Sequence, residues 1–261
     1  MPDEIGSRSD QARPASGNEL RALLEGDEAA LLALLENPHV EEPHICQMLE
    51  RLDLSASVLA AVASEGKWTS SEGIRLRLAR HPHTPRRISL TLLRQLYLFD
   101  LVRLSLLPSA PAEVRRVADE IIIMRVPHVP VGQKLTLARR GSARVAGALL
   151  AEGHPQAVKL ALANAYLTES QVLKVLAKPG LPERVVAAIA RNPKWSCQYN
   201  VRVALVRNVH TPTLVVRAIL PNLTLRDLKD VLMLEALASH LRKYIKQELA
   251  RRSGADAGEK P

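Results

Sequence analysis

The feature that most constrains the fold is a match of the sequence to itself at a fixed offset. Residues 58–101 align without a gap on residues 185–228, an offset of 127, with 17 identities in 44 positions. The identities place Trp68 on Trp195 and repeat the tripeptide His-Thr-Pro in the same register. Rare residues in one register are not expected between two unrelated helical segments, so we predict that the chain is internally duplicated.

A shorter period lies inside each half. The motif Pro-x-x-Pro starts at Pro82 and Pro108, which are 26 apart in the numbering, and at Pro127 and Pro179, which are 52 apart. The first proline can end one helix, and the second fits the first turn of the next, where its missing N–H costs nothing. The alternative interpretation is a polyproline ligand of a small adaptor domain. We favour helix pairs, because the offset of 127 is close to five such periods.

The composition indicates helices rather than strands. Aromatic residues make up 3% of the chain, and its apolar positions are mostly Leu, Ala and Val. No segment alternates polar and apolar residues over a strand length, so we predict no sheet. Thr168 and Thr224 have side chains suited to begin a helix. Helices are expected over 20–36, 43–52, 55–65, 72–81, 85–106, 111–124, 130–140, 143–152, 155–164, 168–177, 182–191, 199–208, 212–220 and 225–250.

The expected fold class is therefore all-α: an α-solenoid, in which short helix pairs form a superhelix, internally duplicated with the offset of 127. The last helix is expected to close the array, because its Leu and Ile residues keep one side apolar and its charges occupy the other. The predicted organisation is a disordered tail at 1–17, a first half of the repeat array at 18–127, a second half at 128–224, a C-terminal capping helix at 225–250 and a disordered tail at 251–261.

A recurring phrase runs apolar-Arg-x-apolar-Leu-Ala, followed by Arg or Asn, Asn or His, and Pro. It stands, with variations, as IRLRLARHPHTP, VVAAIARNPKW, VRVALVRNVHTP and LLALLENPHVEEP. This phrase resembles the leucine-rich repeat variant and related HEAT-like bacterial repeats, over roughly residues 20–228. The resemblance implies helix pairs in a superhelix and a binding role rather than a reaction. The iron–sulfur module found beside some of these repeats needs a cysteine cluster, whereas this chain has only Cys46 and Cys197.

Acidic residues are absent from three long segments of this chain, whose net charge is +9: residues 73–99, 121–151 and 184–226. If the arginines of these segments line up on one face, they would grip phosphates or an acidic protein. The alternative is that they are solvated or pair with acids of neighbouring repeats. The candidate residues for binding a polyanion or a partner are Arg75, Arg77, Arg80, Arg139, Arg140, Arg184, Arg191, Arg202 and Arg207.

Tryptophans and histidines form two other groups of candidate residues. Trp68 and Trp195 are predicted to be packing anchors between repeats, with stacking on a base or ligand ring as the alternative. Several possible metal ligands lie close in sequence: His39, His44, Cys46, His81 and His83. A zinc site needs three or four converging ligands, and His39 and His44 do not recur in the second half. We therefore predict no metal and no cofactor.

The expected function is a non-catalytic helical-repeat scaffold that binds a macromolecule along its inner face, first of all a protein with an acidic surface. The alternative is nucleic-acid binding by the arginines, and a third hypothesis is a HEAT-like DNA glycosylase using Asp100 or Asp227. No phosphate-binding loop or nucleophile elbow is present, so we predict that the chain is not an enzyme. No apolar run is long enough to span a bilayer, and the first residues lack a signal-peptide core, so the expected location is the cytoplasm.

Overall fold

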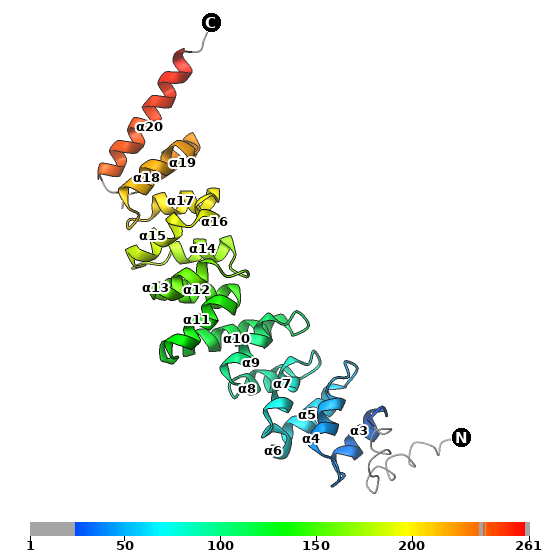
Figure 1. The fold of residues 1–261 in the computed structure, drawn as a ribbon. Helices are drawn as coiled ribbons and strands as arrows, with labels where there is room; N and C mark the ends of the chain where they lie inside the picture. The colour runs from blue at the N-terminus through cyan, green and yellow to red at the C-terminus, as the bar shows by residue number, and fades with distance from the viewer. Residues whose placement is uncertain (1–23, 235–236, 238, 259–261) are drawn as a thin grey trace. The chain divides into compact units, whose positions relative to one another are not determined.

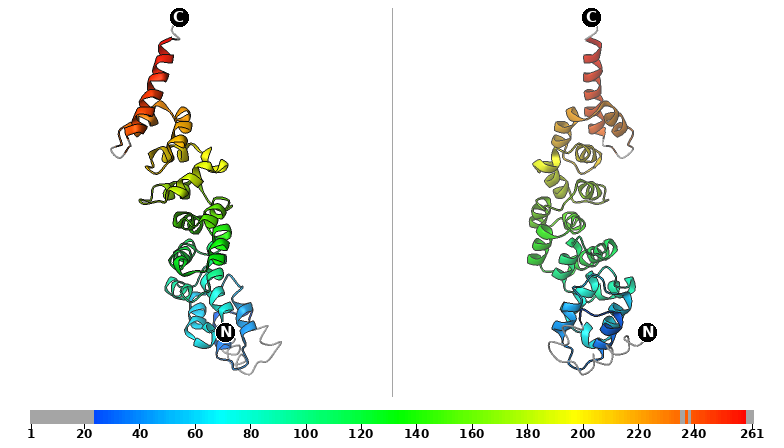
Figure 2. Two further views of the ribbon diagram at one scale, coloured as in Figure 1. Left: turned by 60° about the vertical axis from the view of Figure 1, so that its left-hand side comes forward. Right: turned by 90° about the vertical axis from the view of Figure 1, so that its right-hand side faces the viewer.

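The computed structural model describes residues 24–234, 237 and 239–258, and these residues form helices and connecting turns without any strand (Figure 1). The chain divides into two compact units, the first ending at Arg125 and the second beginning at Val126. Within each unit, helices pack mainly against helices close to them in the chain (Figure 2). The all-α class predicted from composition is confirmed for the described residues.

The first unit contains eight α-helices among its described residues. They are α3 (Glu28–Leu35), α4 (Glu42–Met48), α5 (Ala56–Ser64), α6 (Gly66–Thr69), α7 (Glu72–Arg80), α8 (Arg86–Leu93), α9 (Leu98–Leu106) and α10 (Ala112–Arg125). Asp27 begins α3 by accepting a hydrogen bond from the Ala30 N–H, and Ser55 does the same for Val58 at the start of α5. The core consists of aliphatic side chains from successive helices, among them fully buried Ile45.

The second unit continues with short helices and ends in a long one. Its elements are η1 (Val126–His128), α11 (Val131–Arg140), α12 (Ala143–Glu152), α13 (Pro155–Leu162), α14 (Glu169–Leu176), α15 (Glu183–Arg191), α16 (Pro193–Ser196), α17 (Tyr199–Arg207), α18 (Thr213–Ile219), η2 (Leu220–Asn222), α19 (Leu225–Leu232) and α20 (Ser239–Gly258). Thr168 and Thr224 cap α14 and α19 with their hydroxyls, as predicted. Gly153 ends α12 with a φ of 83°, a backbone conformation that favours glycine.

Helix starts in the two units coincide at the offset found in the sequence. For example, α5 begins at Ala56 and α15 at Glu183, while α7 begins at Glu72 and α17 at Tyr199. The same offset relates the starts of α3 and α13, α4 and α14, α6 and α16, α8 and α18, and α9 and α19. Residues 127 apart, called equivalent residues, therefore stand at the same places relative to these helix starts, and their surroundings can be compared one by one.

Two helices predicted as continuous are broken in the structure. The segment 85–106 forms α8 and α9, and 225–250 forms α19 and the first part of α20. In each case an arginine binds the carbonyl groups that the break leaves without helical partners. Arg125 donates to Leu96 O and Arg94 O. Arg242 donates to Leu232 O, Leu234 O and Leu237 O. The pattern of apolar residues continues across both breaks and gives no sign of them.

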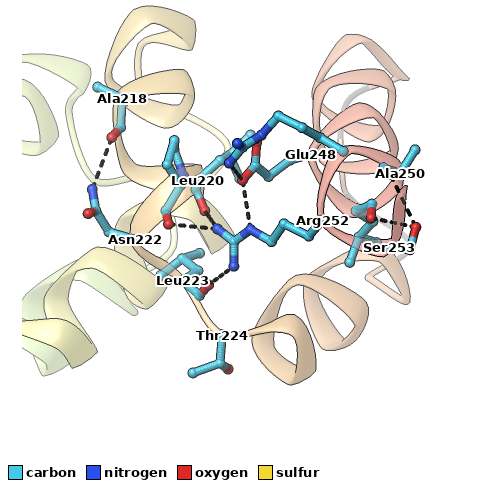
Figure 3. A network of polar contacts seen from close by, with 12 residues as sticks. Ala218, Leu220, Asn222, Leu223, Thr224, Glu248, Ala250, Arg252 and Ser253 are labelled. Atoms are coloured by element: carbon cyan, nitrogen blue, oxygen red, sulfur yellow. Dashed lines mark hydrogen bonds and ion pairs between the residues drawn. The ribbon is translucent and has the colours of Figure 1, made fainter. Parts of the chain in front are cut away.

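The C-terminal tail expected to be disordered at 251–261 is helical as far as Gly258, and residues 259–261 lie outside the described part, as does the tail predicted at 1–17. The reason is a polar network between α20 and the turn at η2 (Figure 3). Arg252 donates to Leu223 O at 2.6 Å, Leu220 O at 3.0 Å and Pro221 O at 2.6 Å. Glu248 pairs with both Arg251 and Arg252.

Replacing Arg252 by alanine is expected to lower the free energy of unfolding by about 2–3 kcal/mol, because three carbonyls and Glu248 lose a charged donor. Hydrogen exchange of α20 amides and denaturant unfolding measure this. Arg251→Ala is the matched control: Arg251 is largely exposed and contacts only Glu248 among the described residues, so a much smaller effect is expected. Equal effects of the two variants would contradict the role given to Arg252.

The same network predicts a loss of stability in acid. Hydrogen bonds from Arg251, and with them those from Arg252, lower the pKa of Glu248 to about 2. Because the folded pKa lies below the ordinary value of 4.5, the stabilisation is fully present above about pH 4.5 and is lost as the pH falls towards 2. The protection factors of the α20 amides, which correct for the intrinsic pH dependence of exchange, should therefore fall over this range in the wild-type protein and much less in Glu248→Gln.

Candidate functional site

Two of the predicted binding arginines hold equivalent turns of their own chain. Arg75 donates from Nη1 to Thr69 O and Ser70 O at the end of α6, at 2.8 and 3.0 Å. Arg202, its counterpart, donates from Nε to Ser196 O at the end of α16, at 2.8 Å. The short helices α6 and α16, which the sequence analysis did not anticipate, thus have C-terminal carbonyls satisfied by an arginine of the following helix.

Arg77 and Arg80 share one carboxylate. Arg77 Nε lies 2.9 Å from Glu50 Oε1, and Arg80 Nη2 lies 2.5 Å from Glu50 Oε2. Glu50 follows α4, so this ion pair bridges the surface between α4 and α7. Arg77 and Arg80 are therefore already paired with a carboxylate of their own chain, Glu50.

The remaining predicted arginines belong to the second unit. Arg184 donates to Gly153 O at 2.8 Å. The other four are exposed and form no ion pair within 4 Å among the described residues: Arg139, Arg140, Arg191 and Arg207. They come from three helices, α11, α15 and α17.

The two tryptophans are both buried, with 3% of their surface exposed. A lysine lies over each ring, Lys67 at 4.3 Å from the Trp68 centroid and Lys194 at 4.4 Å from that of Trp195. Trp195 Nε1 donates to Leu162 O at 3.0 Å, whereas Trp68 Nε1 has no partner among the described residues. Rings buried in this way offer no free face on which a base or ligand ring could stack.

Two of the histidines considered as metal ligands, buried His81 and exposed His83, contact the backbone instead. His81 Nε2 lies 2.7 Å from Arg51 O, and His81 Nδ1 lies 3.2 Å from the His83 amide nitrogen. Burial lowers the pKa of His81, in keeping with a neutral ring that donates from Nε2 and accepts at Nδ1. His83 Nδ1 lies 3.0 Å from Leu54 O, so these two rings join the turn after α7 to the chain after α4.

An open groove of about 570 Å³ lies between α14 and α17 in the second unit. Its lining includes the apolar side chains of Leu173, Leu176, Val203 and Val209. Two cations stand in its lining, Arg207 at the end of α17 and Lys178 just after α14, together with the amide side chains of Asn200 and Asn208. Of these residues, only Arg207 was singled out from the sequence.

Both asparagines in the groove are fixed by contacts on their own chain. Asn208 Nδ2 donates to Leu176 O at 2.9 Å, and its Oδ1 accepts from the His210 N–H at 3.0 Å. Asn200 Nδ2 donates to Glu169 Oε1 at 3.0 Å. Lys178 and Arg207 form no such side-chain bond among the described residues. The unpaired polar groups of this groove are therefore its two cations.

The equivalent surface of the first unit is filled by the Glu50 ion pairs. Subtracting the offset of 127 places Ala177 on Glu50, Ala204 on Arg77 and Arg207 on Arg80. Two long charged side chains of the first unit are thus alanines in the second. The third, Arg207, remains, but among the described residues no carboxylate pairs with it as Glu50 pairs with Arg80.

The second cation of the groove, Lys178, does not make the contacts that its equivalent in the first unit makes. Lys178 is equivalent to Arg51, whose Nη1 donates to Leu24 O at 2.6 Å and Gly26 O at 3.1 Å. Gly153 is equivalent to Gly26, and in the second unit its carbonyl is bound by Arg184 instead. Lys178 binds no carbonyl among the described residues, so its ammonium group is available to a ligand in the groove.

Arg207 lies close enough to Asp227 for its charge to affect the pKa of that carboxylate. Hydrogen bonds from Thr224 and Tyr199 lower the pKa of Asp227, and the positive charges of Arg207 and Arg226 lower it further. Asp227 Oδ2 accepts from both hydroxyls. Asp227 is therefore ionised and already hydrogen-bonded, and it lies beyond ion-pair distance of Arg207. A residue-by-residue comparison of the two halves gives the exchange of Glu50 for Ala177, but only the structure shows that residue 177 and Arg207 line the same groove.

No helix in the described part of the chain combines the length and the apolar character needed to cross a membrane. Comparison with family models, with curated proteins and with solved structures gives no match to this chain.

Proposed function

We propose that this chain is a non-catalytic helical-repeat scaffold of duplicated, solenoid type, which binds an acidic segment of a protein partner in the groove between α14 and α17. The helix starts that coincide at one constant offset support the duplication. Packing between helices close in sequence, within each unit, supports a solenoid of the kind that the leucine-rich repeat variant and HEAT-like resemblance implies.

One observation carries the choice of partner. Arg207 and Lys178 line a partly apolar groove and pair with no carboxylate among the described residues. Their equivalents in the first unit, Arg80 and Arg51, bind Glu50 and backbone carbonyls. An apolar surface with two cations in its lining suits a peptide that presents a carboxylate next to apolar side chains. A uniform polyanion would leave that apolar surface uncovered.

Nucleic acid is the less favoured partner because most of the candidate arginines already bind groups of their own chain. Of the nine candidate arginines, five bind carbonyls or Glu50: Arg75, Arg77, Arg80, Arg184 and Arg202. These five guanidinium groups would have to leave those partners to reach phosphates, which removes much of the counterion release that drives such binding.

Charge reversal in the groove should abolish most of the binding. Affinity for short fluorescein-labelled peptides rich in Glu and Leu is measured by anisotropy with the full chain. K178E/R207E is expected to weaken binding at least about tenfold, because two attractive contacts become repulsive. R139E/R140E makes the same change of charge on α11 and should leave affinity within about twofold.

The same two variants test the alternative. Labelled DNA and RNA, titrated over ~50–300 mM salt, report phosphate contacts through the slope of affinity against salt. Tight binding with a steep slope, reduced equally by both variants, would make the chain a nucleic-acid-binding protein. Equal loss of peptide binding in both variants would likewise remove the groove from the proposal.

A further inference from the structure

Glu50 shows how a carboxylate sits on the surface between helices equivalent to α14 and α17. It accepts from Arg77 at one oxygen and from Arg80 at the other, and its own side chain is about half exposed. The carboxylate lies over the surface between α4 and α7 rather than inside the core. In the second unit the residue equivalent to Glu50 is Ala177, whose side chain is only a methyl group.

We infer that the groove between α14 and α17 is a seat for a single glutamate side chain of the partner, held by Arg207 and Lys178 where Glu50 is held within the first unit. This inference rests on the proposed function and specifies its ligand. The first unit binds its own carboxylate, and the second unit leaves the corresponding place open to another chain.

Three differences between equivalent residues of the two units make the groove more accessible to a carboxylate from another chain. Ala177 in place of Glu50 removes the internal carboxylate, and Ala204 in place of Arg77 removes bulk from the α17 side of the groove. Arg184 in place of Ser57 binds Gly153 O, the carbonyl equivalent to one that Arg51 binds. Together they leave Arg207 and Lys178 in the lining beside apolar side chains.

The apolar lining of the groove determines which residues of the partner can flank the glutamate. Leu173 and Val203 are half-buried and Val209 is 62% exposed, so apolar surface remains open beside the cations. In the first unit the residues at the first and last of these positions are Cys46 and Pro82. A segment with an apolar residue next to its glutamate would cover this surface, whereas a run of acidic residues would not.

A carboxylate introduced into the chain itself tests the proposed glutamate-binding site, because it should compete with the partner. Ala177→Glu restores the residue found in the first unit and keeps both cations, while Ala177→Gln adds the same bulk without charge. The probes are a labelled peptide with one Glu between Leu residues and its twin with Gln at that position. The wild-type chain is expected to bind the Glu peptide at least about fivefold more tightly than the Gln twin.

In A177E, affinity for the Glu peptide should fall about tenfold and the preference over the Gln twin should disappear, because Arg207 is already paired. A177Q should keep both the affinity and the preference to within about threefold. An equal loss in A177Q and A177E, or no preference in the wild-type chain, overturns the inference. If K178E/R207E weakens binding but A177E does not, the proposed function stands and the glutamate seat is overturned. Denaturation midpoints of both Ala177 variants confirm that they fold.

Discussion

Replacing Trp195 by alanine is expected to lower the free energy of unfolding of the second unit by about 3–5 kcal/mol, the largest effect of any single substitution considered for this chain. The ring is 3% exposed, and its Nε1 donates to Leu162 O, so alanine leaves a cavity and an unpaired carbonyl. Denaturant unfolding followed by far-ultraviolet circular dichroism measures the loss. Trp68, the only other tryptophan, reports by fluorescence whether the first unit is affected.

Phenylalanine substitutions separate the ring from its hydrogen bond. Trp195→Phe should cost about 1–3 kcal/mol more than Trp68→Phe, because only Trp195 Nε1 has a carbonyl partner among the described residues. Equal costs at the two positions would show that packing, and not the bond to Leu162 O, distinguishes them. A loss below about 1 kcal/mol in Trp195→Ala would contradict the role of this ring as an anchor.

Asn164→Ala is the second substitution with a large expected effect, about 3 kcal/mol. Asn164 is 1% exposed, and its Nδ2 donates to Ala138 O at 2.9 Å and Gly141 O at 3.0 Å. Its Oδ1 accepts from the Tyr166 N–H at 2.7 Å. The side chain therefore joins the end of α13 to the end of α11, and alanine leaves three backbone groups without this partner.

Asn192→Ala is the matched control for Asn164, because Asn192 accepts a hydrogen bond only from the Lys194 N–H among the described residues. It should cost about 1 kcal/mol, the usual value for a helix N-cap. Hydrogen exchange of α11 amides distinguishes the two: they should exchange faster in Asn164→Ala and remain unchanged in Asn192→Ala. Unchanged α11 exchange in both variants would show that Asn164 does not hold the end of α11.

Most helix positions could be predicted because their signals are local. Proline and threonine mark the starts of several helices, and α12 occupies residues 143–152 as expected. The breaks after α8 and α19 could not be predicted, since the residues that stabilise them lie elsewhere in the chain, at Arg125 and Arg242. The short helices α6 and α16 were missed because a single turn carries no periodicity.

The candidate site was harder to predict than the fold. Counting arginines in acid-free segments treats Arg80 and Arg207 alike, although one binds Glu50 and the other has no carboxylate. What separates them is the residue at a different position, Glu50 or Ala177, brought close by packing between helices. The charge pattern therefore identified basic helices, and only the contacts show which cation is available.

The arginines that bind backbone carbonyls give part of the positive charge of this chain a structural role. Arg51, Arg125 and Arg252 each hold two or more carbonyl oxygens of a turn well before them in the chain. A guanidinium group does this with a planar set of donors that an ammonium group lacks, so lysine is no conservative substitute at these positions. We therefore expect these arginines to be substituted in evolution as rarely as buried leucines. Part of the high isoelectric point of the chain then follows from the way its turns are held.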